Sequence, residues 1–371
     1  MRKFAAVGLA AASLALAFQA LTVHYNYGGN WTGLFCIGDR WPQPVELATP
    51  YQFHESWGYD GQAYRLIAHD PFLTRGFDRY LDDPRYRYSR GLVSVTAWAL
   101  ALGDDRWIDT AYLVVILISV FGGAYWLAMV AARFGYPAWF GILFLFAPAT
   151  VVGIDRLTID VVLAALCVAF VALQPGSGGW LVTLTLAAMC RETGFLLIGA
   201  GFMVLLKSTG KVRPAVLATA VPALMWLGWV AMRLPPSPTT RAGFIPLSGY
   251  LARLAHPLHY TFPPVIRVIT QTLDYTALAA VPVALWCLWR IRPARPELFA
   301  CVLPVLFASL LDIWSEVYAF GRTMTPFWLL LAIRGVEGGL WLALVPIALM
   351  DVRIGWQLGG EVLGILRGLV T

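Results

Sequence analysis

The strongest constraint on this chain is its series of long, uninterrupted apolar segments. The clearest run from Phe4 to Leu21, Thr110 to Ala132, Pro214 to Leu234 and Val265 to Trp289. A helix needs roughly 20 such residues to cross a bilayer. Barrel strands would alternate in polarity, so these continuous segments predict helices. The hydrophobic share of 59% and the charged share of only 13% fit an integral membrane protein.

We expect an all-α fold, a polytopic transmembrane bundle of about 9 to 11 membrane segments, some short or broken. The chain is predicted to form one membrane-embedded domain over residues 1–371. Residues 1–21 would be the first transmembrane helix, 22–90 a long extracytoplasmic loop, 91–350 the remaining helices, and 351–371 an amphipathic tail. The alternative for the first segment is a secretory signal cleaved near Ala15-Leu16-Ala17.

The net charge of +6 comes from basic residues at the ends of apolar segments, including Lys207, Lys211, Arg213, Arg290, Arg292 and Arg295. This pattern marks cytoplasmic turns and gives no reason to expect a nucleic-acid partner. Two further assumptions bring Arg133 and Arg334 to the same side. Gly91–Leu102 would dip into the membrane without crossing it, and Trp180–Leu206 would be two half-helices meeting at Arg191-Glu192. If every short segment crossed, Arg133 would lie outside.

The polar segment after the first helix contains Gly58-Tyr59-Asp60-Gly61-Gln62-Ala63-Tyr64. Glycines permit a sharp turn and a close approach by a ligand, so we predict that Asp60 is a catalytic carboxylate. An ordinary turn aspartate is the alternative. Tyr59 and Tyr64 would either stack on a sugar or anchor at the membrane interface. Gln62 is a further candidate binding residue, and Gln62–Leu73 is expected to form a helix on the membrane surface.

Other charged residues at the tips of apolar segments are candidates for a cavity that opens outward. Arg191 would contact a phosphate and Glu192 would orient it, or the two would form an internal ion pair. Arg87 and Arg90 would meet a substrate phosphate or lipid headgroups. For the remaining candidates the alternatives are a charged turn between two helices at Asp155 and a solvated loop at Glu316 and Arg322.

The sequence lacks the motifs GxxxxGK[ST], GxSxG and HExxH, and it has no GxGxxG between a strand and a helix. It therefore gives no sign of a nucleotide-sugar domain. Of the five cysteines, four lie in apolar segments and Cys36 lies alone in the first loop, so no disulfide framework or metal cluster follows from their spacing.

Three motifs resemble those of bacterial membrane proteins of the GT-C glycosyltransferase superfamily, closest to relatives of the GPI mannosyltransferases and other enzymes that depend on polyprenyl-phosphate sugars. They are Tyr59-Asp60-Gly61-Gln62-Ala63-Tyr64, Arg87-Tyr88-Ser89-Arg90 and Arg191-Glu192-Thr193-Gly194. The resemblance covers roughly Phe4 to Leu206. It implies a polyprenyl-phosphate sugar donor, an inverting transfer and a first-loop acid as the base, which Asp60 matches. The loop lacks a paired Asp-x-Asp or Glu-x-Asp, so a divalent metal is not favoured.

These features together predict a membrane glycosyltransferase in the bacterial inner membrane, with its active site facing the periplasm or exterior. Its partners would be the lipid-linked donor, the bilayer, and a glycan, lipid or protein acceptor. Two alternatives are a transporter or flippase for a lipid-linked saccharide, which would also need internal charges and broken helices, and a noncatalytic subunit of an envelope assembly.

Overall fold

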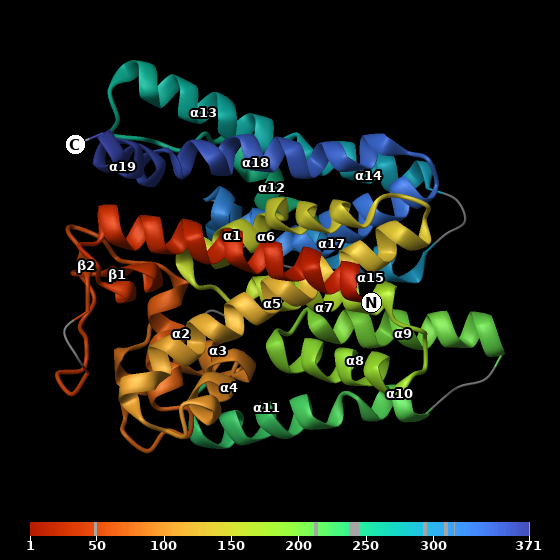
Figure 1. Ribbon diagram of the computed structural model, residues 1–371, viewed down its shortest axis with the longest axis horizontal. Helices are drawn as coiled ribbons and strands as arrows, with labels where there is room; N and C mark the ends of the chain where they lie inside the picture. Colours follow the sequence, from red (N-terminus) through yellow and green to blue (C-terminus); the bar gives the residue numbers. More distant parts are fainter. Residues whose placement is uncertain are drawn as a thin grey trace.

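A computed structural model describes residues 1–47, 50–210, 214–236, 245–291, 295–307, 311–314 and 316–370. Lys211, Arg213 and Arg292 lie outside the described residues. The fold is helical throughout this part of the chain, apart from two short strands. Most long helices run roughly parallel to one direction, horizontal in Figure 1, as expected for a membrane bundle.

Four helices are long and apolar enough to cross a membrane. They are α1 (Arg2–Asn26), α5 (Asp105–Arg133), α10 with α11 (Pro214–Ala218, Val221–Arg233) and α13 with α14 (Pro264–Leu278, Ala280–Arg290). Two bent pairs raise this number to six within the described residues. The first joins η3 (Ala138–Phe146) to α6 (Pro148–Arg156) at 62°, and the second joins η4 and α18 (Trp341–Leu344, Val345–Gln357) to α19 (Gly359–Val370) at 54°.

The larger expected number of membrane segments includes helices that are too short to cross alone. Those over 10 to 17 residues are α7 (Asp160–Ala172), α8 (Gly178–Cys190), α9 (Gly194–Thr209) and α15 (Pro296–Phe307). The remaining helices of the second half are α12 (Ser248–Ala255), α16 (Leu311–Trp314) and α17 (Val317–Glu337). The expected boundary before the tail, at 350/351, falls inside α18, and α19 forms the tail itself.

Helices α7, α8 and α9 fold back on one another beside α17 (Figure 1). Gly194 lies against Ala187, and Gly201 lies against the ring of Trp180, so α8 and α9 are antiparallel. The break between them falls at Arg191–Thr193, as the two charges in the apolar segment predicted. At the tip of this hairpin Arg191 is buried, whereas the side chain of Glu192 is 50% exposed.

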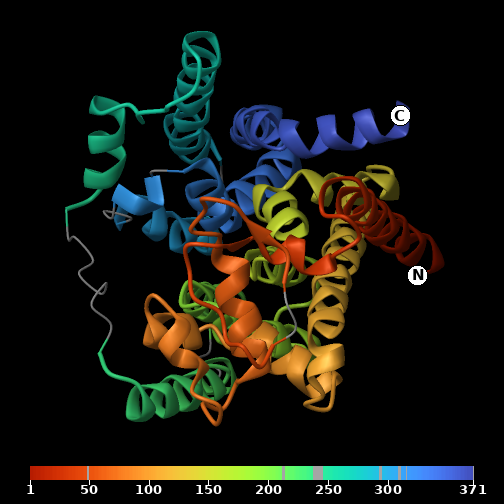
Figure 2. The same ribbon diagram turned by 90° about the vertical axis from the view of Figure 1, so that its left-hand side faces the viewer.

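The polar segment after α1 carries η1 (Trp31–Phe35), β1 (Ile37–Gly38), β2 (Gln52–Phe53), α2 (Asp60–His69), η2 (Phe77–Tyr80) and α3 (Pro84–Tyr88), and the apolar helix α4 (Leu92–Leu100) follows it. The two strands are parallel. The segment lies at one end of the molecule, at the left in Figure 1 and toward the viewer in Figure 2. At nine residues, α4 is too short to cross a bilayer, consistent with a segment that only dips into it.

Helix α2 differs from the expected surface helix over Gln62–Leu73. It begins at Asp60 and ends at His69, and it is buried against α4 and α5. It stops there because the carboxylate of Asp70 accepts hydrogen bonds from the backbone amides of Thr74, Arg75 and Phe77, which fixes a turn in place of another helical turn.

Basic residues from distant segments meet at one end of the bundle. Arg133 and Arg334 line the same cavity of about 360 Å³. Arg334 is also paired with Glu297 at 2.8 Å, and Arg295 with Glu337 at 3.3 Å. These contacts agree with the expectation that Arg133, Arg295 and Arg334 share one side.

Candidate functional site

The turn before α2 is built by glycines and by the side chain of Gln62. Gly58 has a φ of +76°, which favours glycine. A Cβ on Gly61 would lie 2.3 Å from the carbonyl oxygen of Arg156, so only glycine allows this approach. The Gln62 amide accepts from the backbone amide of Gly38 at 3.2 Å and donates to the carbonyl of Trp57 at 2.7 Å. Gln62 therefore braces the turn that presents Asp60.

Asp60 is held between two arginines from distant parts of the chain. Nη1 of Arg87 donates to Oδ1 at 2.6 Å, and Nη2 of Arg322, on α17, donates to Oδ2. The Asp60 side chain is 15% exposed. The ring of Tyr59 lies beneath Arg322, 4.9 Å from its guanidinium carbon to the ring centroid. Asp60 is thus oriented on both oxygens and remains in contact with solvent.

The two arginines determine the acidity of Asp60. Burial alone would raise its pKa, but the charges and hydrogen bonds of Arg322 and Arg87 outweigh burial and hold the pKa well below its ordinary value. The carboxyl is therefore ionised across the physiological range. In this arrangement it is a weak base, because a general base works best with a pKa near the operating pH.

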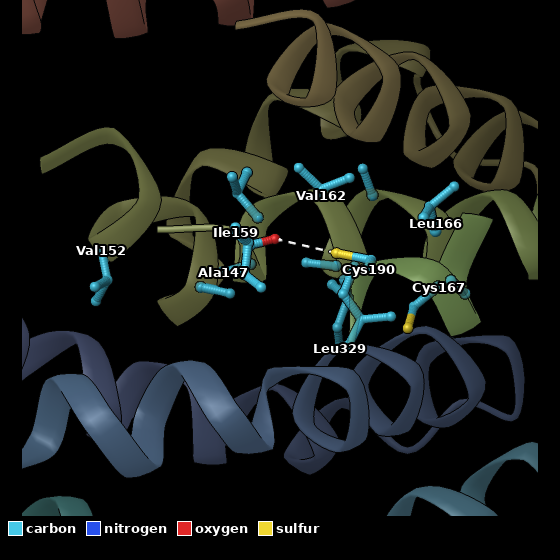
Figure 3. Close-up of a cluster of buried hydrophobic side chains, with 14 of the residues drawn as sticks. Ala147, Val152, Ile159, Val162, Leu166, Cys167, Cys190 and Leu329 are labelled. Atoms are coloured by element: carbon cyan, nitrogen blue, oxygen red, sulfur yellow. Dashed lines mark hydrogen bonds between the residues drawn. The ribbon is translucent and has the colours of Figure 1, made fainter. Parts of the chain in front are cut away.

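The tips of the short helices extend this network. Asp160, at the start of α7, accepts from Nη1 of Arg322 at 3.0 Å and from Nη1 of Arg191. Arg191 also donates to the hydroxyl of Thr323 at 3.2 Å. Figure 3 shows how the neighbouring backbone is fixed: Sγ of Cys190, at the end of α8, donates to the carbonyl of Ile159 at 3.6 Å.

Glu192 continues the row on the other side of Arg191. Its carboxylate lies 3.5 Å from Nε of Arg191 and accepts two bonds from Arg90, at 2.5 and 2.9 Å. Arg90 also contacts the hydroxyls of Tyr64, at 3.3 Å, and Tyr86.

At the opposite end of the row, Arg87 donates to both oxygens of Asp82, at 2.8 and 2.9 Å. Acids and arginines therefore alternate along a continuous row, which we call the charge ladder: Asp82, Arg87, Asp60, Arg322, Asp160, Arg191, Glu192 and Arg90. It contains four acids and four arginines, so its formal charge is zero.

A cavity of about 280 Å³ opens beside one end of the ladder. Asp60, Asp82 and Arg87 belong to both the ladder and the cavity wall. The other polar and aromatic lining residues are Trp41, Trp57, Tyr59, Gln62 and Tyr80. Asp60 thus stands between a solvent-accessible cavity and a row of arginines.

Several buried hydrogen-bonding groups near the ladder have no partner among the described residues. They are Nε of Arg322 and the hydroxyls of Tyr59 and Thr193. An unpaired buried donor costs about 1–3 kcal/mol, so such groups tend to mark places where a bound molecule completes the bonding.

The structure brings most of the predicted site residues together but not all of them. Asp155 and Glu316 lie outside the ladder. Asp155 accepts from the Tyr318 hydroxyl at 3.1 Å and pairs with Arg156 at 3.0 Å, and Glu316 accepts from the Gln357 amide at 3.0 Å. These contacts pair both carboxylates with side chains that do not belong to the ladder.

Sequence reasoning missed Asp82 and did not select Asp160 as a site residue. Asp160 carries the same signal as Arg191, a charge at the end of a short apolar segment. Asp82 carries no signal of its own among the many acids of the first loop.

Metal binding was not favoured from the sequence. The ladder carboxylates are all engaged by arginines, and across the described ranges no three His, Cys, Asp or Glu side chains gather in a group that could hold a metal ion. Comparison of the chain with protein-family models, curated proteins and solved structures finds no match.

Proposed function

We propose that this chain is a membrane glycosyltransferase that moves a sugar from a polyprenyl-phosphate donor to an acceptor outside the cytoplasm, with inversion at the anomeric carbon. The observation that carries the proposal is the position of Asp60, which lines a polar cavity and contacts Arg87 and Arg322 of the charge ladder. An acceptor hydroxyl needs a carboxylate, and a departing phosphate needs guanidinium groups. The motif resemblance to GT-C enzymes points the same way.

In the proposed reaction an acceptor hydroxyl attacks the anomeric carbon and Asp60 takes its proton. The bond from that carbon to the phosphate oxygen breaks, and its electron pair leaves with the polyprenyl phosphate. Arg322 and Arg191 stabilise the charge that develops on the departing oxygen. Their side chains are almost fully buried, which strengthens such an interaction.

Because the ladder has no net charge, binding of the donor phosphate involves an exchange of partners at an arginine. Both Nη groups of Arg322 already bond acids, and its Nε has no partner among the described residues. A substrate phosphate that binds Arg322 through Nε and one Nη group therefore displaces a carboxylate. Arg322 is the arginine that joins Asp60 to the rest of the ladder. When the donor phosphate takes Arg322, Asp60 loses one stabilising partner and becomes a stronger base. Donor binding and base activation are then one event.

The proposed location is the bacterial inner membrane in a multi-pass arrangement, with the ladder and cavity facing the periplasm. Its support is the position of Arg133, Arg295 and Arg334 at one end of the bundle and of the polar 22–90 segment at the other end. The acceptor would be a glycan, lipid or protein that enters from the polar end.

The experiment is Asp60→Asn, assayed as transfer of radiolabelled sugar from a polyprenyl-phosphate donor in membranes that contain the protein. Loss of the base should lower the rate by at least about 10²-fold. The variant should remain folded, because Arg87 keeps Asp82 and Arg322 keeps Asp160 as partners. Asp78→Asn, a carboxylate of the same segment outside the ladder, is the control and should transfer normally. Near-normal transfer by Asp60→Asn would refute the assignment.

A buried charge at a helix break, such as Arg191 between α8 and α9, is also typical of transporters, so a carrier of lipid-linked saccharides is the second candidate. The reaction product distinguishes a glycosyltransferase from a carrier. A glycosyltransferase leaves the sugar covalently attached to an acceptor, whereas a carrier leaves the donor intact on the opposite leaflet.

A further inference from the structure

The cavity beside Asp60 has walls of two chemical kinds. Trp41, Trp57 and Tyr80 supply aromatic surface, and Asp60 and Asp82 supply carboxylates. The carboxylates accept hydrogen bonds, and the aromatic rings cover apolar surface. A ligand for this cavity therefore needs apolar faces together with several hydroxyl donors around its edge.

A sugar ring has this combination. Its C–H groups form apolar faces, and its hydroxyls radiate from the rim. A lipid chain would offer no donor to the lone pairs that the arginines leave free on Asp60 and Asp82, and it would remove these charged groups from water, which is unfavourable. The volume of about 280 Å³ lies at the small end of ligand sites, which typically span about 300–1,000 Å³. It suits one ring better than an extended peptide.

The aromatic wall is held in place before any ligand arrives. The indole N–H of Trp41 donates to the carbonyl of Tyr80, and the carbonyl of Trp57 accepts from Gln62 at 2.7 Å. The rings of Trp41 and Trp57 meet edge to face with centroids 6.0 Å apart. The contacts of Trp41 with Tyr80 and with Trp57 join segments far apart in the loop, so the wall is preorganised, which lowers the entropic cost of binding.

We infer that this cavity binds one sugar ring of a saccharide acceptor, with Trp57 against the face of the ring and Asp60 and Asp82 accepting from its hydroxyls. That the bound saccharide is the acceptor rests on the proposed function. That the cavity binds a sugar rests on its walls alone.

Saturation-transfer NMR on the purified full chain in detergent tests the inference, with methyl α-glycosides of mannose, glucose and galactose as probes and the tripeptide Gly-Ser-Gly as comparison. At least one glycoside should bind the wild type. Trp57→Ala should weaken that binding by roughly tenfold, because the apolar face of the sugar loses its contact with the indole. Trp139→Ala is the matched control, because Trp57 and Trp139 are both 60% exposed and Trp139 does not line the cavity.

Three results would overturn the inference: no glycoside binds, Trp57→Ala and Trp139→Ala bind alike, or the tripeptide binds in place of the glycosides with the same dependence on Trp57. Equal melting temperatures for the two tryptophan variants would establish that any difference is local. Failure here is distinct from failure of the proposed function. Sugar binding that needs Trp57 combined with transfer that does not need Asp60 would retain the cavity assignment and refute the catalytic one.

Discussion

At the scale of single residues, the contacts of Asp60 explain how its carboxylate can be ionised and still be a weak base in the resting arrangement. In the resting arrangement Arg322 and Arg87 keep its pKa well below the ordinary value. Proton abstraction by such an acid is weak until one arginine turns to the substrate. The proposed exchange of Asp60 for the donor phosphate at Arg322 should therefore affect the kinetics of transfer.

The pH dependence of turnover should show whether the pKa of Asp60 rises when the donor binds. The acid limb of kcat/KM reports the free enzyme, where the pKa of Asp60 is strongly lowered, so kcat/KM should stay flat toward acid pH as far as this group is concerned. The acid limb of kcat reports the complex, where the pKa of Asp60 has risen, so kcat should fall at a higher pH. Rate profiles at saturating and limiting donor measure both. Coincident acid limbs would contradict the exchange.

Gly61 offers a second prediction at this scale. Its missing Cβ would meet two backbone carbonyl oxygens, 2.3 Å away in Arg156 and 2.8 Å away in Phe35. Backbone atoms cannot move aside cheaply, so Gly61→Ala should lower the free energy of unfolding by about 1–3 kcal/mol, seen as a lower melting temperature in detergent. Gly199→Ala is the control, because nothing lies within 4 Å of a Cβ there. An unchanged Gly61→Ala variant would mean that the start of α2 is loosely packed.

At the scale of elements, the α8–α9 hairpin is the part of the site that the sequence predicted best. Two adjacent charges inside an apolar segment are costly in lipid, so a break at Arg191-Glu192 could be expected from the residues alone. Their partners could not. Arg191 meets Asp160, and Glu192 meets Arg90 from before α4, and such pairings arise only when separate helices pack together.

The pair Arg90 and Glu192 should show this coupling in a double-mutant cycle. With Arg90→Gln, Glu192→Gln and the double variant, thermal stability in detergent should give an interaction of about 1 kcal/mol, modest because Glu192 is half-exposed. Arg106 and Asp104 form the comparison pair, which is surface-exposed and should show no measurable coupling. Additive effects of the two substitutions on stability would mean that Arg90 and Glu192 do not couple the hairpin tip to the first loop.

At the scale of the whole molecule, the sequence correctly predicted a helical fold with several helices able to cross a membrane. Of the 9 to 11 expected membrane segments, some short or broken, four to six within the described residues are long and apolar enough to cross. Hydropathy identified α1, α5 and the other long helices because their segments are apolar throughout. Apolar composition alone does not distinguish a crossing helix from a short one, but the charges at Arg191-Glu192 predicted the break between α8 and α9. The aromatic cavity was also beyond sequence reasoning, since Trp41, Trp57 and Tyr80 meet only through the folding of the loop.

The proposed orientation is open to a labelling experiment. The five cysteines are buried, so a single introduced thiol should dominate the reaction with a membrane-impermeant maleimide. Val45→Cys, at a position 92% exposed in the first polar segment, should react in intact spheroplasts. Lys207→Cys, exposed at the end of α9, should react only after the membrane is opened. The reverse pattern would place the ladder and its cavity on the cytoplasmic side.

The alternation of the ladder also determines where the proton released by the reaction can go. A guanidinium keeps its protons in proteins, so it cannot pass one along. Arg322 therefore blocks any relay from Asp60 toward Asp160, and Arg87 blocks one toward Asp82. A proton can leave Asp60 through the cavity, which opens to solvent. Each turnover would then acidify the compartment on the polar side, and the buried row of charges would form no proton path across the bilayer.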